Sequence, residues 1–333
     1  MKTRLLGLNQ AGDALTVPAV GLGCMGLSQA YPPFPEKEEG IRFLREAVDA
    51  GAVFLDTAEV YGIYKNEELV GEALEGIRDR VILATKIGWR IRDGKRAGLD
   101  SRPESVRKAV EGCLRRLRTD HIDLLYQHRV DPEVPIEEVA GVMSELYKEG
   151  KIRFWGMSEP GVETLRRANS VFRVAAVENE YSLWFREAER EMIPVLEELG
   201  IGLVPFAPLG RGVLAGRVRR GDTFPKGDTR GTIPRFSDPE LLDANLALAD
   251  LVNETAAAHG VSPATFSLAW ILRQKPWIVP IPGSRKLSRV LENLAAADFS
   301  MPEEDWHVFQ AKADAVRVTG DRYDPAGMAM VGR

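Results

Sequence analysis

The sequence of 333 residues contains only two cysteines, Cys24 and Cys113. They form no CxxC pair and no other spacing typical of metal ligands, so neither a disulfide framework nor a cysteine-based metal site is expected. Such sparse cysteine use in a chain of this length is typical of a reducing compartment. We therefore expect no metal site.

Long apolar runs are also missing, and none approaches the length of a membrane span. The apolar stretch near the N-terminus is too short for a secretory signal. The formal net charge of −5 argues against binding to nucleic acid by bulk attraction. We expect a cytoplasmic protein that binds neither nucleic acid nor membrane, and the sequence leaves its oligomeric state open.

What the sequence does contain is an ordinary globular composition, 44% hydrophobic and 28% charged. A chain of this length can bury a substantial core. No linker rich in proline or serine divides it, and the composition does not shift along it. We therefore expect a single domain over residues 1–333.

Short runs rich in Val, Ile, Leu and Phe recur along the chain, each followed by a segment with helical period. There are eight, at residues 19–24, 53–58, 81–87, 123–128, 153–158, 174–181, 202–207 and 277–282. Strands that are apolar throughout and are joined by helices indicate a parallel sheet covered on both faces. Eight such units predict an α/β fold that closes as a (β/α)8 barrel of the TIM type.

Proline and glycine mark the expected helix boundaries. Prolines occur where the first turns of helices are expected, at Pro103, Pro135 and Pro263. Glycines occur just after the expected last turns, at Gly51, Gly150 and Gly200.

Other segments add to the repeating units. Residues 3–16 hold Gly12-Asp13 between two short runs, which predicts an N-terminal β-hairpin. Residues 210–238 lack helical period and predict a long irregular connection. Residues 240–259 predict an extra helix.

One alternative fold comes from Gly21-Leu22-Gly23-Cys24-Met25-Gly26, which satisfies the GxGxxG pattern of dinucleotide-binding Rossmann folds. In those folds a helix starts within the glycines. Here three of the four residues at 32–35 are proline, which opposes that helix. We instead expect glycines that let a strand end approach a ligand or a neighbouring strand closely.

Polar residues end three of the predicted strands: Asp56, Lys86 and His128. Active sites of such barrels lie at the C-terminal ends of the strands, so these residues are expected on one rim. A buried aspartate and a buried lysine are each costly alone, and pairing offsets that cost. Tyr61, five residues after Asp56, is then a candidate general acid, because a nearby cation favours the phenolate and lowers the pKa.

The sequence resembles the aldo-keto reductases from end to end. The likeness includes Phe54-Leu55-Asp56-Thr57-Ala58-Glu59-Val60-Tyr61-Gly62 and the run His128-Arg129-Val130-Asp131-Pro132. This last run and Ser158-Glu159 are typical of a bacterial and fungal branch. The matching blocks occupy residues 54–62, 83–86, 126–132, 156–159, 180–184, 208–212 and 281–286.

The resemblance implies that Asp56, Tyr61, Lys86 and His128 form a catalytic tetrad. Tyr61 is then the proton donor to an aldehyde or ketone carbonyl that receives hydride from NADPH. Asp56 would hold Lys86, and His128 would donate a hydrogen bond that positions the carbonyl oxygen. The expected activity is reversible reduction to an alcohol.

A basic cluster follows the last predicted strand at Arg285, Lys286 and Arg289, at the start of a helix whose dipole also favours anions. By the resemblance this segment binds the 2′-phosphate, so NADPH/NADP+ is preferred over NADH. The resemblance implies a full set of cofactor contacts: Gly23, Cys24, Met25, Asp56, Ser158, Glu159, Glu178, Phe206, Ala207, Pro208, Leu209, Gly210, Arg211, Gly283, Ser284, Arg285, Arg289, Glu292 and Asn293.

Glu178 departs from the family pattern, which has a glutamine that pairs with the carboxamide of the cofactor. An ionised glutamate accepts hydrogen bonds but cannot donate them. Unless it is protonated or neutralised by an arginine, its charge is expected to favour NADP+ over NADPH and to bias the enzyme towards oxidation.

Two other functions fit parts of the sequence. Some relatives of this family bind NADPH and modulate a membrane channel, so an NADPH-sensing regulatory subunit with little turnover is the alternative function. A Schiff-base lyase using Lys86 would need a neutral lysine, and Asp56 opposes this by favouring the ammonium. The substrate is not fixed by the sequence; candidate pocket walls are Tyr31, Trp89, Arg129, Trp184, Arg322 and Tyr323.

Overall fold

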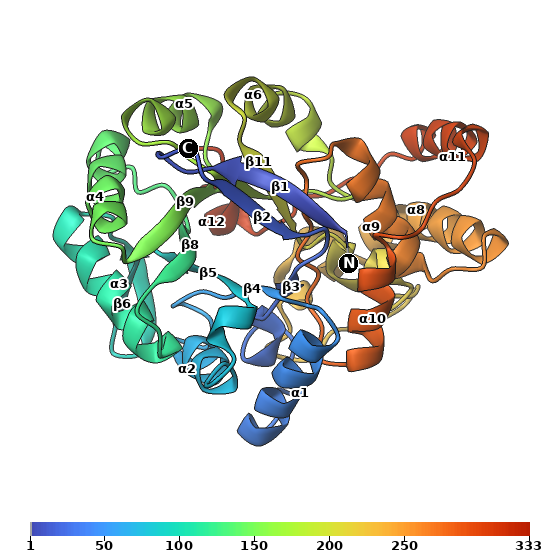
Figure 1. The fold of residues 1–333 in the computed structure, drawn as a ribbon. Coiled ribbons are helices and arrows are strands. Elements are labelled where there is room, and N and C mark those ends of the chain that lie inside the picture. Colours follow the sequence, from blue (N-terminus) through green and yellow to red (C-terminus); the bar gives the residue numbers. More distant parts are fainter. Residues whose placement is uncertain (1) are drawn as a thin grey trace.

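Seven parallel strands form the centre of the protein in a computed structural model that describes residues 2–333 (Figure 1). In sheet order, which is the reverse of chain order, the strands are β11 (Gly202–Phe206), β10 (Ala176–Glu180), β9 (Ile152–Ser158), β8 (Ile122–Gln127), β5 (Ile82–Ile87), β4 (Phe54–Asp56) and β3 (Leu22–Gly23). The predicted α/β barrel is confirmed. Its strands are shorter than expected at the start of the chain.

The eighth predicted strand, 277–282, is wrong as a continuous strand, although this segment closes the barrel. Val279 N donates to Leu203 O at 2.9 Å on one side, and Gly21 N donates to Pro280 O at 2.9 Å on the other. Pro280 and Pro282 have no N–H to donate, so a regular ladder cannot form. Separate hydrogen bonds therefore replace the eighth strand.

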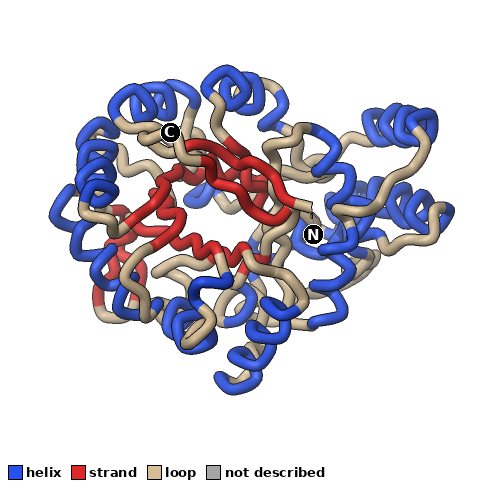
Figure 2. Tube along the Cα trace, in the orientation of Figure 1, coloured by secondary structure: helices blue, strands red, loops and turns tan. Residues whose placement is uncertain are grey.

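The predicted N-terminal hairpin is confirmed as β1 (Thr3–Leu8) and β2 (Ala14–Pro18), an antiparallel pair. It lies across one end of the barrel (Figure 2). A Cβ on Gly7 would lie 2.0 Å from Ala175 O, so only glycine allows the hairpin to lie this close. Leu6 and Val17 belong to the apolar cluster inside the barrel, and the hairpin seals this end.

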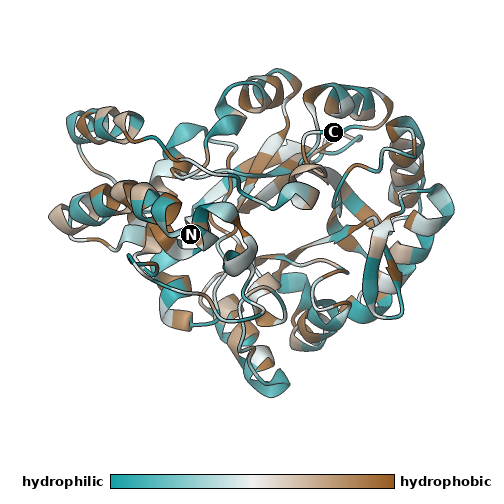
Figure 3. Cartoon of the chain, turned by 180° about the vertical axis from the view of Figure 1, so that it is seen from behind, coloured by the Kyte–Doolittle hydropathy of each residue, from teal (hydrophilic) through white to brown (hydrophobic). Residues whose placement is uncertain are grey.

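Helices surround the strands and carry both apolar and polar residues (Figure 3). Those that alternate with the barrel segments are α1 (Lys37–Asp49), α2 (Lys65–Ala73), α3 (Pro103–Leu117), α4 (Ile136–Lys148), α5 (Val162–Val171), α6 (Met192–Leu199), α9 (Pro263–Gln274) and α10 (Leu287–Ala295). Pro103 and Pro263 begin helices as predicted, while Pro135 is the N-cap of α4. Gly51 and Gly150 lie just beyond helix ends, and Gly200 caps α6.

Additional helices lie outside the repeat. The predicted helix at 240–259 is α8 (Pro239–Ala258), and the other additions are α7 (Pro234–Ser237), α11 (Glu303–Ala315) and α12 (Pro325–Met328). Short 3-10 helices are η1 (Met25–Leu27), η2 (Arg78–Arg80), η3 (Glu187–Glu189), η4 (Gly210–Ala215) and η5 (Thr229–Thr232). The irregular connection at 210–238 thus contains only η4, η5 and α7.

A second hairpin, β6 (Trp89–Arg92) and β7 (Lys95–Leu99), follows β5 and was not predicted. Its sequence does carry a hairpin signal, since Trp89-Arg90-Ile91-Arg92 alternates apolar and polar residues and is followed by Asp93-Gly94. Within residues 2–333, no helix is both long enough and apolar enough to span a membrane.

Candidate active site

The polar end of the barrel interior is built by strand register. Asp56 pairs in register with Ala84, and Lys86 lies two residues further along the same strand. Because side chains alternate between the two faces of a strand, Asp56 and Lys86 both point inward. Glu178 on β10 joins them. Deeper inward positions are apolar, among them Phe54, Leu124, Ala176 and Val204.

Lys86 lies at the centre of a buried charge cluster. Its Nζ donates to Asp56 Oδ1 and, at 3.0 Å, to Thr57 O, and lies 3.3 Å from Glu178 Oε2. The side chain of Lys86 is fully buried, and those of Asp56 and Glu178 are 3% exposed. Burial opposes the charge of Lys86, but the two carboxyl groups outweigh it and raise the lysine pKa. Lys86 is therefore an ammonium ion.

Tyr61 lies in the turn after β4, with its ring centroid 5.3 Å from Lys86 Nζ. Burial raises the pKa of Tyr61 above its usual value, and the Lys86 charge opposes this shift without reversing it. The prediction that Lys86 lowers the pKa of Tyr61 below its usual value is therefore wrong for the protein without a bound ligand. The phenol holds its proton at neutral pH, as a proton donor must.

His128 follows β8 and completes the group. Its ring packs edge-on against Tyr61, with centroids 5.8 Å apart, and against Trp89 at 6.1 Å. Burial lowers the pKa of His128 well below its usual value, with contributions from nearby cations such as Arg129. A neutral imidazole keeps one N–H to donate. The structure therefore brings together all four residues expected at the rim.

Two supporting residues were missed, although both lie in or near the segment at 54–62. Glu59 Oε1 accepts from Gly88 N at 3.1 Å and Trp89 N at 3.3 Å, and so holds Trp89 beside His128. Burial, with some repulsion from Glu67, raises the pKa of Glu59 to about 8. Asn66 donates to Cys24 O at 3.0 Å and ties the start of α2 to the first βα loop.

The expected cofactor contacts begin where β3 meets the closing segment. Gly23 forms a parallel bridge with Gly283, and a Cβ on Gly23 would lie 2.9 Å from Ile281 O. Cys24 N donates to Asp56 O at 2.8 Å, and Met25 starts η1. Burial raises the pKa of the Cys24 thiol to about 12. The glycines thus allow two backbones to approach, as expected.

The segment after β11 has a strained backbone. Phe206 is half-buried beside the apolar cluster of the barrel, and Pro208 and Leu209 lead into η4. Ala207, Gly210 and Arg211 have φ of 46°, 54° and 53°, a region that non-glycine residues rarely adopt. Strain of this kind is concentrated at functional sites.

Arg211 points into the protein, and only 8% of its side chain is exposed. One guanidinium nitrogen, Nη2, is buried without a hydrogen-bond partner in the described chain and lies 3.8 Å from Glu180 Oε2. The guanidinium also lies over the Tyr323 ring at 5.4 Å. A buried donor without an acceptor is a position where a ligand oxygen would be stabilised.

Cations gather near the start of α10. Burial lowers the pKa of Arg289, and the positive charges of Arg217 and Arg285 add to this shift, so the three guanidinium groups share one region. Arg217 was missed, because it lies in the connection at 210–238. Ser284 Oγ accepts from Lys286 N at 3.1 Å, and Asn293 is buried.

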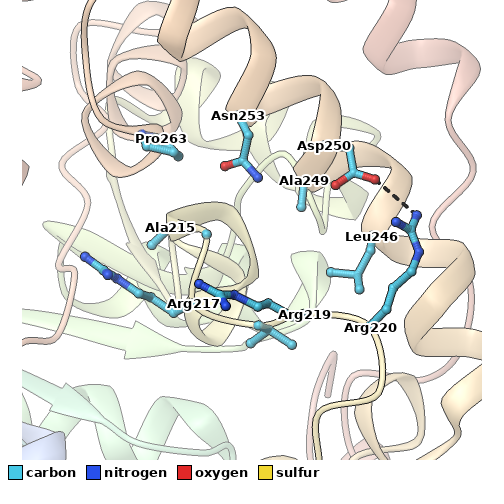
Figure 4. A pocket seen from close by; sticks show the side chains of 11 residues that line it. Ala215, Arg217, Arg219, Arg220, Leu246, Ala249, Asp250, Asn253 and Pro263 are labelled. Carbon is cyan, nitrogen blue, oxygen red and sulfur yellow. Dashed lines mark hydrogen bonds and ion pairs between the residues drawn. The ribbon is translucent and has the colours of Figure 1, made fainter.

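Two further contacts lie beside this cluster. Glu292 O accepts from Thr265 Oγ1 at 2.9 Å, which fixes the backbone of α10 there. A hollow lies between residues 215–220 and α8, and Figure 4 shows Arg217 and Arg219 at its edge. Arg220 pairs with Asp250 across it, at 3.1 Å.

Ser158 and Glu159 at the end of β9 have protein partners. Ser158 Oγ accepts from Arg129 Nη1 at 3.0 Å. Arg322 donates to both carboxylate oxygens of Glu159, at 2.8 Å to Oε1, and approaches Glu180 at 3.3 Å. The Glu159 carboxylate is therefore occupied by the C-terminal segment, which reaches the rim here.

The other candidate pocket walls lie close to these residues. Tyr31 lies under the guanidinium of Arg230 at 5.4 Å, and Tyr323 lies under that of Arg322 at 5.1 Å. Trp184 packs edge-on against Phe236.

Comparison with known proteins gives a consistent result. The family described as "Aldo/keto reductase family" matches residues 19–314. A soybean (Glycine max) protein named "Probable aldo-keto reductase 1" is 39% identical over 308 residues, which is 92% of this chain and 88% of that protein.

Similar solved structures give the same result. A glycerol dehydrogenase from Gluconobacter oxydans is 30% identical, with a TM-score of 0.84 over 97% of each chain. An aldo-keto reductase from Klebsiella pneumoniae, solved in complex with NADPH, is 28% identical, with a TM-score of 0.71 over 97% of this chain and 99% of that one.

Proposed function

Because the chain belongs to the aldo/keto reductase family, we propose that it reduces aldehyde or ketone carbonyls to alcohols, reversibly, with NADPH. The observation that carries this proposal is the buried ion pair of Lys86 and Asp56 beneath the ring of Tyr61, with His128 edge-on to the same ring. The enzyme class is that of the NADP(H)-dependent oxidoreductases.

The residues present fit this cofactor. The close approach of Gly23 and Gly283 leaves no side chain in the way at the barrel rim, and Phe206 offers a half-buried ring for stacking. The unpartnered Nη2 of Arg211 suits a pyrophosphate oxygen. When bound, NADPH supplies the hydride.

The phosphate end of the cofactor has its own partners. Arg217, Arg285 and Arg289 would hold the 2′-phosphate, since guanidinium groups bind phosphate oxygens in a bidentate manner. Gly283 and Ser284 flank this cluster and are proposed contacts with the same end of the cofactor, and Glu292 and Asn293 are proposed contacts with its adenine. On the nicotinamide side, Ser158, Glu159 and Glu178 lie at the adjacent strand ends, with Asp56 across the barrel.

The proton would come from Tyr61. As its O–H bond breaks, the proton joins the carbonyl oxygen, and the phenolate that remains is stabilised by the Lys86 ammonium. Asp56 holds Lys86 in place and keeps it charged. The neutral His128 would donate a hydrogen bond to the same carbonyl oxygen and so place it within reach of the phenol.

The test is NADPH oxidation against a panel of aldehydes, ketones and sugars. Tyr61→Phe should lower kcat by about 10² to 10⁴, the range for a lost general acid. Tyr147→Phe is the matched control, because Tyr147 packs against Phe172 outside the barrel interior, and it should turn over like the wild type.

Other outcomes would replace this proposal. Activity that persists in Tyr61→Phe contradicts the assigned role of the phenol. Tight NADPH binding without turnover of any carbonyl in the panel would favour the sensing subunit. Imine trapping by borohydride without cofactor would favour the lyase, which the raised pKa of Lys86 opposes.

A further inference from the structure

Glu178 is a carboxyl group beside Lys86 that has no role in the reaction as proposed so far. It lies on β10 with its side chain 3% exposed, and its Oε2 is 3.3 Å from Lys86 Nζ. Among the described residues, neither Glu178 Oε2 nor Asp56 Oδ2 has a hydrogen-bond partner. Two carboxyl groups therefore share one ammonium, and two buried oxygens beside it can hold a proton.

The charged and titratable groups around Glu178 come from several elements. Its register neighbours on β9 and β11, Ser158 and Val204, carry no charge. The groups that act on it, or on which it acts, are Asp56 on β4, Tyr61 after β4, Lys86 on β5, Tyr126 on β8 and Arg129 after β8. Glu178 lies 3.3 Å from Lys86, and it is close enough to Asp56 to hydrogen-bond with that carboxyl group, whose pKa is also raised by burial.

We propose that Glu178 is a positioning residue that competes with Tyr61 for the positive charge of Lys86, so that proton donation by Tyr61 requires Glu178 to be protonated. This inference rests on the proposed function and deepens it. With Glu178 neutral, the charges of Lys86 and Asp56 balance, and the ammonium can stabilise the phenolate. With Glu178 ionised, the cluster carries one excess negative charge and opposes the phenolate.

The same charges predict how ionisation of Glu178 affects the rate of carbonyl reduction. In reduction the Tyr61 O–H bond breaks and negative charge develops on the phenol oxygen, so an ionised Glu178 slows this step. Burial and the neighbouring Asp56 raise the pKa of Glu178 to about 8, which places the change within the working range of an enzyme assay. Tyr61 titrates above this range and His128 below it.

The experiment is the pH profile of carbonyl reduction at saturating NADPH. Wild-type kcat should fall about tenfold between roughly pH 7 and pH 9, because the protonated fraction of a group with a pKa of about 8 falls about tenfold over that range, with KM for the carbonyl nearly unchanged. Glu178→Gln keeps the shape of the side chain and removes its titration, so the kcat of this variant should change by no more than about twofold over the same pH range. Circular dichroism confirms that this variant is folded.

Glu59→Gln is the matched control, because Glu59 is also buried and its pKa also lies at about 8. Its carboxyl group accepts from the backbone of Gly88 and Trp89 and forms no ion pair with Lys86, which Glu59 meets through its backbone N–H donating to Lys86 O at 3.2 Å. The fall in kcat should persist in this variant. A fall that disappears in Glu59→Gln and persists in Glu178→Gln overturns the proposal, as does a level wild-type profile.

A second readout needs neither cofactor nor turnover. Infrared difference spectra of the free protein, wild type minus Glu178→Gln, should show the carbonyl stretch of a protonated carboxyl group that disappears as pH rises through about 8. An ionised Glu178 already at about pH 6 overturns the proposal. Absence of any carbonyl reduction, with this band present, contradicts the proposed function and leaves the charge competition standing.

Discussion

The two halves of the barrel rim handle charge in opposite ways. At the ends of β4, β5 and β10, Lys86, Asp56 and Glu178 are buried and already in contact. Just after η4 and at the start of α10, Arg217 and Arg285 are exposed, and within residues 2–333 neither forms an ion pair with a carboxylate, whereas Arg211 inside η4 is buried 3.8 Å from Glu180.

The difference indicates which half is complete without a ligand. Buried charges must be paired within the protein, because leaving one unpaired is costly. Exposed cations are solvated and can exchange water for phosphate. The half with Lys86 and the proposed proton donor Tyr61, called the catalytic half below, is therefore organised before any ligand binds. The half with the exposed arginines, called the cofactor half below, depends on a ligand to balance its charge.

Breaking the buried pair should have the largest effect. Lys86→Met leaves Asp56 buried without its cation and should cost about 3 kcal/mol or more in the free energy of unfolding, measured with urea. It should also lower kcat at least a hundredfold, because the phenolate loses its counter-charge.

Lys151→Met is the control for this change, since Lys151 pairs with Glu111 at the surface and such pairs contribute about 1 kcal/mol or less. If Lys86→Met lowers the free energy of unfolding no more than Lys151→Met does, the catalytic half is not held together by its buried pair.

A second prediction concerns the pH dependence of stability that arises from Glu59, which holds Trp89 beside His128. Its pKa is about 8 in the folded protein and about 4.3 when unfolded, so between these values only the folded state holds the proton. Its contribution to stability is complete below about pH 4 and is lost as pH rises to about 8, by up to ~1.4 kcal/mol per pH unit.

Urea unfolding of Glu59→Gln at several pH values checks this. The fall in the free energy of unfolding between about pH 5 and pH 8 should be smaller in this variant than in the wild type. Glu163→Gln, at an exposed position on α5, should keep the wild-type slope. Equal slopes in all three proteins would show that Glu59 is ionised in the folded state.

The same contrast explains what could be predicted from the sequence. Asp56, Lys86 and His128 could be placed on one rim because each ends an apolar strand, and parallel strands align their ends. Glu178 lies inside its predicted strand, 174–181, and not at the end, so the alignment of strand ends did not place it beside Lys86. The pairing of Arg322 with Glu159 joins segments with no pattern in common.

Two local features also escaped prediction. The hairpin of β6 and β7 was missed although Trp89-Arg90-Ile91-Arg92 alternates and Asp93-Gly94 forms a typical hairpin turn, because the predicted strands rested on wholly apolar runs and not on alternating ones. The closing segment after α9 has a strand-like apolar pattern, yet Pro280 and Pro282 interrupt its hydrogen bonding. Apolar pattern alone does not report the backbone donors that a ladder needs.

On the cofactor half, Arg289→Ala should weaken NADPH binding about tenfold and leave NADH binding nearly unchanged, because only NADPH carries the 2′-phosphate. Dissociation constants from fluorescence titration measure this, and added salt should reduce the difference. Arg220→Ala is the control, since Arg220 already pairs with Asp250. Equal losses of affinity for NADPH and NADH would show that Arg289 does not bind the 2′-phosphate.

The smallest effect joins the two halves, because Glu178 lies where the catalytic cluster meets the nicotinamide side. Only the oxidised ring is positively charged, so an ionised Glu178 should favour NADP+ over NADPH. Since its pKa is about 8, this preference should be weak at pH 7 and about threefold stronger at pH 9. Dissociation constants for both forms, measured at the two pH values in wild type, Glu178→Gln and Glu59→Gln, decide the matter. The pH-dependent preference should vanish only in Glu178→Gln; a ratio unchanged in that variant would mean that the carboxyl group does not sense the charge of the ring.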